Sequence, residues 1–158
     1  MFAARAQHIE QVILPALDRG EVVLCDRFTD SSIAYQGYGR GVPLDTIRTL
    51  ERLLCQGLRP DLTFLLDIDA ATSIERTGVR NQKAQQPNTR FEQEGMEFFE
   101  RVREGYLAIA RQEPQRVRVI AASRTIEQIQ AAVRAAVDEF LQSPLRAGGS
   151  TAGDSRGV

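Results

Sequence analysis

Short apolar runs that end next to a carboxylate constrain the fold of this chain most. Residues 22–25 (VVLC) are followed directly by Asp26, and residues 62–66 (LTFLL) by Asp67. Short and nearly continuous apolar runs are typical of parallel strands that are buried on both faces. A third run, residues 117–121, has a similar character. We therefore expect three strands and, because helical segments alternate with them, an α/β fold with a parallel sheet.

Helices are expected wherever apolar residues recur at helical spacing. The expected helices cover residues 2–19, 43–56, 70–77, 95–111 and 125–141, with a short helix or turn at 29–38. Pro15 is expected to kink the first helix, and Thr125 and Gln128 have the spacing of a capping box. Gly37 to Gly41 is glycine-rich and is expected to be flexible.

Two segments are expected to lie outside regular structure. Residues 78–89 are polar and without periodicity, which indicates a mobile surface loop. Residues 143–158 are small and polar, which indicates a disordered tail. The folded domain is therefore expected to span residues 1–142.

The composition and charge of the chain argue against several classes of function. The chain has 158 residues, of which 42% are hydrophobic and 26% charged, as in ordinary globular domains. The net charge of −1 argues against broad electrostatic attraction to nucleic acid or membrane, and no apolar run is long enough to cross a bilayer. Cys25 and Cys55 lack metal-ligand spacing and are expected to be buried free thiols in a reducing cytoplasm. His8 is expected on a helix surface.

Asp26 and Arg27 form the sharpest local signal for chemistry. In open α/β sheets, ligands bind at the carboxyl ends of the strands, where this pair is expected to lie. The guanidinium group of an arginine can hold a phosphate through two parallel hydrogen bonds. An internal ion pair at the end of a strand explains the same two residues equally well.

Two further pairs could bind a nucleoside. Phe2 and Arg5 lie about one turn apart on the first expected helix, where a ring and a guanidinium group can contact a planar base. Tyr35 and Gln36 follow the strand-end pair, and Gln36 carries both a donor and an acceptor. Taken alone, a core phenylalanine, a solvated arginine and a surface turn explain these residues better.

Cations gather around the polar loop of residues 78–89. They are Arg76, Arg80, Lys83 and Arg90. Several cations on a segment between two helices can form a lid that closes over phosphates and excludes water. A solvated charged loop explains them at least as well.

Together these segments resemble bacterial thymidylate kinases. The matching stretches are FAARAQHIEQVILPAL, GEVVLCDRFTDSSIAYQGYGRG, LRPDLTFLLDIDAATSIERTG and RFEQEGMEFFERVREGYLAIA. The resemblance runs from Phe2 to about Leu141. It implies a P-loop NTP hydrolase-like fold, in a cytoplasmic homodimer that transfers the terminal phosphoryl group of ATP to dTMP, with Mg²⁺. The product, dTDP, belongs to pyrimidine deoxynucleotide biosynthesis.

The resemblance also implies roles for individual residues. Catalysis would use Arg27 on the acceptor phosphate, Asp26 near the metal, and Arg90 near the phosphates of ATP. The residues that bind dTMP would be Phe2, Arg5, Arg27, Ser32, Tyr35 and Gln36. Phe2 would stack on thymine and Arg5 would hydrogen-bond it. Arg76 and Arg80 would contact ATP, and no residue of this chain is expected as a dedicated metal ligand.

The sequence departs from the family pattern at its start. The family opens with a strand, a G-x-x-x-x-G-K-[ST] loop, a helix and a second strand, none of which is found in these 158 residues. The first of those strands lies between the strands that correspond to residues 22–25 and 62–66, so each would lose a ladder neighbour. We therefore expect an N-terminally truncated kinase that is poorly active alone. The alternative is a non-catalytic nucleotide-binding paralogue or fragment.

Overall fold

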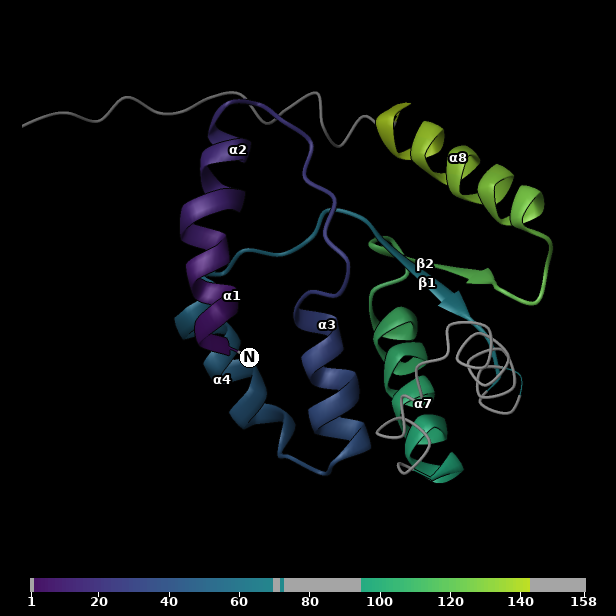
Figure 1. The fold of residues 1–158 in the computed structure, drawn as a ribbon, viewed down its shortest axis with the longest axis horizontal. Helices are drawn as coiled ribbons and strands as arrows, with labels where there is room; N and C mark the ends of the chain where they lie inside the picture. Colours follow the sequence, from purple (N-terminus) through teal and green to yellow (C-terminus); the bar gives the residue numbers. More distant parts are fainter. Residues whose placement is uncertain (1, 70–71, 73–94, 143–158) are drawn as a thin grey trace, which may run out of the picture.

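A computed structural model describes residues 2–69, 72 and 95–142, and Figure 1 shows their arrangement. The elements run in the order α1 (Phe2–His8), η1 (Ile9–Ile13), α2 (Leu14–Asp18), α3 (Thr29–Ser32), η2 (Ile33–Gly39), α4 (Leu44–Leu54), β1 (Thr63–Asp67), α7 (Met96–Gln112), β2 (Val117–Ala121) and α8 (Ile126–Gln142). The two elements labelled η are π-helical turns.

The sheet of the described residues consists of β1 and β2. The strands are parallel and in register, with Thr63 opposite Val117 and Asp67 opposite Ala121. Figure 1 shows the two strands between α7 and α8. The parallel pairing and the flanking helices confirm the expected α/β class. The positions of β1 and β2 agree with the sequence patterns within one residue.

The strand expected over residues 22–25 is not formed, so that prediction was wrong. Val22 and Leu24 are 83% and 94% exposed, and the segment is extended but in no ladder. A strand requires a neighbour that takes its backbone N–H and C=O groups, and no described strand lies beside this segment. The expected burial of Cys25 fails for the same reason, whereas Cys55 is buried as expected.

The first helix is continuous from α1 to α2 and contains a π turn. The Leu14 N–H bonds to the carbonyl of Ile9, five residues back, instead of four. Pro15 has no N–H to donate and its ring crowds the preceding turn, which accounts for the irregularity just before it. A kink was predicted at Pro15, and the structure has a widened π-helical turn just before this residue. His8 is exposed on this helix, as expected.

The helix formed by α3 and η2 lies at the centre of the packing. Its Ala34 is fully buried and packs with Phe98 and Val102 of α7. Ile33 on the same helix packs against a cluster of Ile109, Ala110 and Val117 that joins α7 to the sheet. A separate cluster under the first helix contains its residues Ile9 and Ile13 together with Cys55.

Gly37 and Gly39 are buried in η2, where flexibility was expected. A Cβ atom on Gly39 would lie 2.7 Å from Cε2 of Phe98 and 2.9 Å from Cγ2 of Val102. The glycine therefore allows η2 to approach α7 closely. Gly37 and Gly39 are therefore needed for close packing. The prediction of a flexible segment considered only the backbone freedom of glycine and not its small size.

The other expected helices are confirmed with shifts of one or two residues at their ends. The capping box before α8 is present: Gln128 N–H donates to Thr125 Oγ1 at 3.3 Å, and Thr125 N–H donates to Gln128 Oε1 at 3.1 Å. Of the expected helix at residues 70–77, only Thr72 is described, and it is helical. The expected loop and tail, at 78–89 and 143–158, lie outside the described residues.

Candidate functional site

Arg27 occupies a strained backbone position directly before α3. Its φ of 65° lies in the left-handed region, which costs a non-glycine residue about 1–2 kcal/mol. The guanidinium carbon lies 4.2 Å from the centre of the Tyr35 ring. Strained residues often occur where a binding site requires a particular side-chain direction. Here the strained turn directs the arginine across the face of a tyrosine two turns further along.

Arg5 connects the first helix to α3. Nη1 donates to Ser32 Oγ at 2.8 Å, and Nη2 donates to the Phe28 carbonyl at 3.0 Å. The guanidinium carbon also lies 5.6 Å and 5.5 Å from the ring centres of Phe2 and Phe28. An arginine has five N–H donors, so donors remain for a ligand. The structure thus brings together three of the predicted residues, Phe2, Arg5 and Ser32.

Gln36 lies on the same helix, one residue after Tyr35. Its side-chain Oε1 is buried and has no hydrogen-bond partner in the described part of the chain. A buried acceptor without a partner costs about 1–3 kcal/mol, which a ligand that donates an N–H would recover. The predicted residues Ser32, Tyr35 and Gln36 therefore present a hydroxyl group, an aromatic ring and an unpaired acceptor within little more than one helical turn.

Aromatic residues of α7 hold Tyr35 from behind. Phe98 and Tyr106 make edge-to-face contacts with its ring, at centroid distances of 6.0 Å and 6.3 Å. The Tyr106 hydroxyl is also 2.7 Å from Ser31 Oγ, and burial raises the pKa of Tyr106. Both aromatics lie on the helix that the sequence predicts over residues 95–111. Their helical spacing indicated burial but not which residue they would support.

A buried ion pair fixes the start of α3 below the site. Arg116 donates to both carboxylate oxygens of Asp30 at 2.8 Å, and the two side chains are only 12% and 10% exposed. Arg116 also donates to Thr63 Oγ1 at 2.9 Å and to Glu113 Oε2 at 2.8 Å. The helix that carries the predicted nucleoside residues is thereby tied to the starts of both strands. No sequence pattern marked this pair.

Two carboxylates lie near the carboxyl ends of the strand segments. Asp67, at the end of β1, accepts two hydrogen bonds from Arg103 at 2.6 Å and 2.8 Å, so its charge is already compensated. Asp26 is exposed beside Arg27. Within residues 2–69, 72 and 95–142, no three potential ligands of the His, Cys, Asp or Glu type gather around a metal position. Mg²⁺ in kinases is held by one or two carboxylates together with substrate phosphates, and Asp26 could supply one.

Several predicted site residues cannot be placed. Arg76, Arg80, Lys83 and Arg90 all lie outside the described residues. Their expected roles at ATP remain predictions. The described residues thus include all six residues that were predicted to bind the nucleotide dTMP: Phe2, Arg5, Arg27, Ser32, Tyr35 and Gln36.

Comparison with known proteins identifies the family of the chain. The family model for thymidylate kinase matches residues 1–133. The chain belongs to the thymidylate kinase family. A thymidylate kinase from Desulfovibrio desulfuricans is 48% identical over 142 residues, which are 89% of this chain and 65% of the relative. One from Pelobacter propionicus is 49% identical over 144 residues, which are 90% of this chain and 64% of the relative.

A solved thymidylate kinase supports the fold assignment. The crystal structure from Ehrlichia chaffeensis matches with a TM-score of 0.65 and 33% identity, over 87% of this chain and 60% of that one. The expected P-loop NTP hydrolase-like class is thus confirmed. The chain spans about 65% of the length of the curated thymidylate kinases it matches.

No helix in the described part of this family member is both long enough and apolar enough to cross a membrane.

Proposed function

We propose that this thymidylate kinase family chain binds dTMP on α3 and η2, and that the enzyme it represents phosphorylates dTMP to dTDP with ATP. One observation carries the proposal. Two arginines from different segments, Arg5 and Arg27, converge on one helix, where they contact Ser32 and Tyr35. Two cations, a ring and an unpaired amide oxygen suit a planar base that carries a phosphate.

The roles follow from the chemistry of each side chain. Arg27 holds the acceptor phosphate through its planar guanidinium group, and Phe2 stacks on thymine. Arg5 and Gln36 hydrogen-bond the base, since the unpaired Gln36 oxygen accepts an N–H such as that of the pyrimidine ring. Ser32 and Tyr35 line the nucleoside, and the Tyr35 ring, fixed by α7, helps to exclude a ribose hydroxyl.

The donor side of the proposed reaction uses ATP and Mg²⁺. Arg76 and Arg80 contact ATP, and Arg90 approaches its phosphates. Mg²⁺, when bound, would neutralise charge on the transferring phosphates, and we assign the exposed Asp26 to contact the metal or its waters. Phosphoryl transfer depends mainly on positioning and charge, which is the chemistry that these residues supply. We assign the activity to a domain over residues 1–142.

We also propose a cytoplasmic homodimer that contacts itself through the first helix. Val12 and Leu17 on this helix are 52% and 39% exposed, so an apolar surface is available for a second copy. Sedimentation velocity tests this proposal: Val12→Glu should shift a dimer toward monomer. Glu10→Gln on the same helix is the matched control, and a monomer at all concentrations would contradict the proposal.

Calorimetry with dTMP and thymidine tests the assignment of Arg27. The chain should bind dTMP more tightly than thymidine, because the nucleoside lacks the phosphate. Arg27→Ala should weaken dTMP binding by about tenfold or more and leave thymidine binding nearly unchanged. Arg124→Ala, at an exposed arginine after β2, is the control and should change neither. Equal loss of both ligands in Arg27→Ala would exclude the phosphate role.

A coupled ADP-release assay separates catalysis from binding. The 158 residues contain no G-x-x-x-x-G-K-[ST] segment, which favours the second candidate function, a nucleotide-binding chain without catalysis. We expect dTMP binding with little or no turnover by this chain. Robust turnover would show that it catalyses the reaction without that segment.

A further inference from the structure

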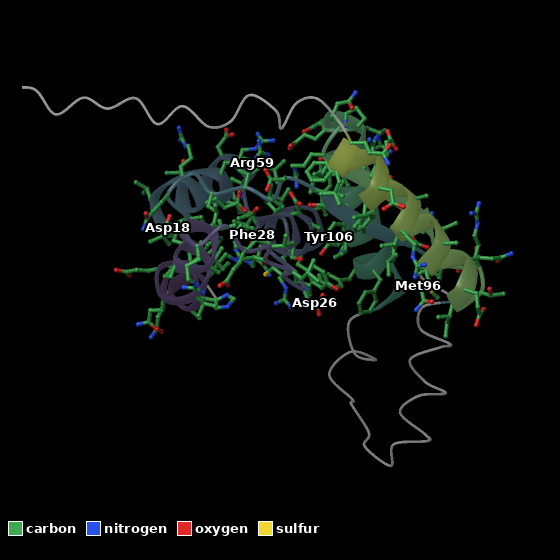
Figure 2. The ribbon with its side chains drawn as sticks, turned by 90° about the horizontal axis from the view of Figure 1, so that it is seen from above. Asp18, Asp26, Phe28, Arg59, Met96 and Tyr106 are labelled. Carbon is green, nitrogen blue, oxygen red and sulfur yellow. The ribbon has the colours of Figure 1, made fainter. Side chains whose placement is uncertain are left out.

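A pocket of about 530 Å³ lies at the opposite edge of the sheet from the predicted dTMP site. Its lining includes Arg59, four residues before β1, and Glu113, four residues before β2. The pocket is therefore at the amino ends of the strands, whereas Asp67 ends β1 at the other edge. Figure 2 shows Arg59 and Asp26 on opposite sides of the ribbon, with Phe28 between them. None of the six predicted dTMP-binding residues lines this pocket.

One face of α4 supplies polar side chains to the pocket. Arg48, Glu51 and Arg52 all line it, and their spacing of three and four residues places them on one helix face. The apolar part of the lining includes Leu44 of α4 and, from other segments, Ile33, Leu58 and Ile109. The pocket thus combines an apolar surface with an arginine-bearing helix face, as small-molecule sites commonly do.

Four acids line the pocket, and two of them, Asp30 and Glu113, are compensated by arginines at short distances. Asp30 accepts both of its short bonds from Arg116, which lies behind the pocket. Glu113 accepts from Arg116 at 2.8 Å and from Arg59 at 2.7 Å. These contacts satisfy the two acids from within the protein. They therefore do little to attract a cationic ligand.

The arginines of α4 are less strongly bound than these acids. Arg52 donates to the Thr49 hydroxyl at 3.4 Å, which is a long hydrogen bond to a neutral group. Arg48 lies 3.7 Å from Asp45, whose side chain is 98% exposed, so water and salt screen this pair. Both guanidinium groups can thus turn toward a ligand at little cost.

We propose that this pocket binds a small organic anion, such as a carboxylate or sulfonate on an apolar ring. Arg48 and Arg52 hold the anionic group, and Ile33, Leu58 and Ile109 contact the ring. The volume accommodates a two-ring compound, since pockets for small ligands begin at about 300 Å³. The site is separate from the dTMP site and does not depend on the function proposed above.

Glu51 gives the proposed site a dependence on pH. Burial raises the pKa of Glu51 to about 7, and the charged groups that act on it are Arg5 of the first helix, Asp30 of α3, Arg48 of α4, and Arg59. Above that pH, Glu51 is negative and repels an anion in the pocket. Below it, the group is neutral. Anion affinity should therefore rise by about threefold as the pH falls through this value.

A titration with 2-naphthoate, followed by ¹⁵N NMR, tests the proposal. We expect saturable shifts at the amides of Arg48, Glu51, Arg52 and Arg59, and none at Arg27 or Tyr35. The Arg48→Ala/Arg52→Ala double variant should weaken binding by about tenfold or more, whereas Arg124→Ala should not. Glu51→Gln should remove the pH dependence. Saturating dTMP should not displace naphthoate, because none of the predicted dTMP-binding residues lines the pocket.

Neutral and cationic analogues decide the ligand class. 2-Naphthol should bind more weakly than 2-naphthoate, and 2-naphthylmethylamine more weakly still. Tighter binding of the amine would overturn the anion assignment. Absence of shifts at about 5 mM naphthoate would overturn the site itself, since that concentration detects binding with a Kd in the millimolar range. Thermal melts of the double variant check that it is folded, and unaltered naphthoate affinity in a folded double variant would also overturn the proposal.

Discussion

Arg5 and Ser32, 27 residues apart in sequence, are joined by a hydrogen bond of 2.8 Å between Nη1 and Oγ. The same guanidinium group donates to the Phe28 carbonyl at 3.0 Å. One side chain therefore ties the first helix to the helix that carries Tyr35 and Gln36. Because the bonds use only part of its donor capacity, Arg5 can serve as both a structural link and a ligand contact.

Replacement of Arg5 should weaken both functions of this residue. Arg5→Ala is expected to weaken dTMP binding by about tenfold and to lower the free energy of unfolding by about 1–2 kcal/mol. Arg5→Lys should recover little of either, because an ammonium group cannot reproduce the planar fork. Calorimetry and urea denaturation measure the two effects. Gln7→Ala, on the exposed part of the same helix, should change neither. Wild-type affinity in Arg5→Ala would remove this residue from the site.

Asp30→Ala should destabilise the fold strongly. The change leaves Arg116 buried, at 12% exposure, without its bidentate partner. Removal of one member of a buried ion pair costs about 3–5 kcal/mol. Asp45→Ala removes an acid from an exposed pair at 3.7 Å and should cost less than about 1 kcal/mol. Urea denaturation of both variants gives the comparison. Equal stability of the two would contradict the role assigned to Asp30.

Gly39→Ala tests whether Gly39 is needed for the close approach of η2 and α7 or for a flexible backbone. The added Cβ would lie 2.7 Å from the Phe98 ring, so α7 must move away from η2. We expect a loss of about 1–3 kcal/mol in the free energy of unfolding. Gly95→Ala adds the same group where no atom of residues 2–69, 72 and 95–142 lies within 4 Å, and should be nearly neutral. If Gly39→Ala were instead stabilising, the glycine would be there for some reason other than the approach of the helices.

Glu51 should make stability depend on pH. Its pKa rises from 4.5 to about 7 through burial, so the folded chain holds this proton more tightly than the unfolded chain does. The resulting stabilisation is complete below the lower value and is lost as the pH rises toward the upper one. Glu51→Gln should therefore gain about 1 kcal/mol over wild type at about pH 8, allowing for partial solvent screening, and little at about pH 4.5. Urea denaturation gives the free energy of unfolding of both proteins at the two pH values. The same difference between Glu51→Gln and wild type at both pH values would contradict this prediction.

Much of the fold could be predicted from the sequence because its signals are local. The helices that become α4, α7 and α8 have clear apolar periodicity, and the reciprocal bonds of Thr125 and Gln128 follow from a three-residue spacing. The run at residues 22–25 has an equally clear pattern but forms no strand. A strand depends on a partner elsewhere in the chain, which local composition cannot supply.

In the candidate site, the residues expected to contact the ligand could be predicted from the sequence, whereas the residues that support them could not. Phe2, Arg5, Arg27, Ser32, Tyr35 and Gln36 were identified from motifs, and the structure gathers them around one helix. The supports of these residues were not identified. Tyr106, 75 residues from Ser31, and Arg116, 86 residues from Asp30, act through contacts that only tertiary structure reveals. The strained φ of Arg27 likewise has no signal in residue type.

An NMR titration of the chain with dTMP tests the central claim most directly. We predict saturable shifts that cluster at the amides of Arg5, Arg27, Ser32, Tyr35 and Gln36, and that shrink for Arg27→Ala at the same dTMP concentration. Thymidine should shift the base-side residues and spare Arg27. Saturable dTMP binding that maps elsewhere, or no binding by a folded chain, would contradict the assignment of the dTMP site to α3 and η2.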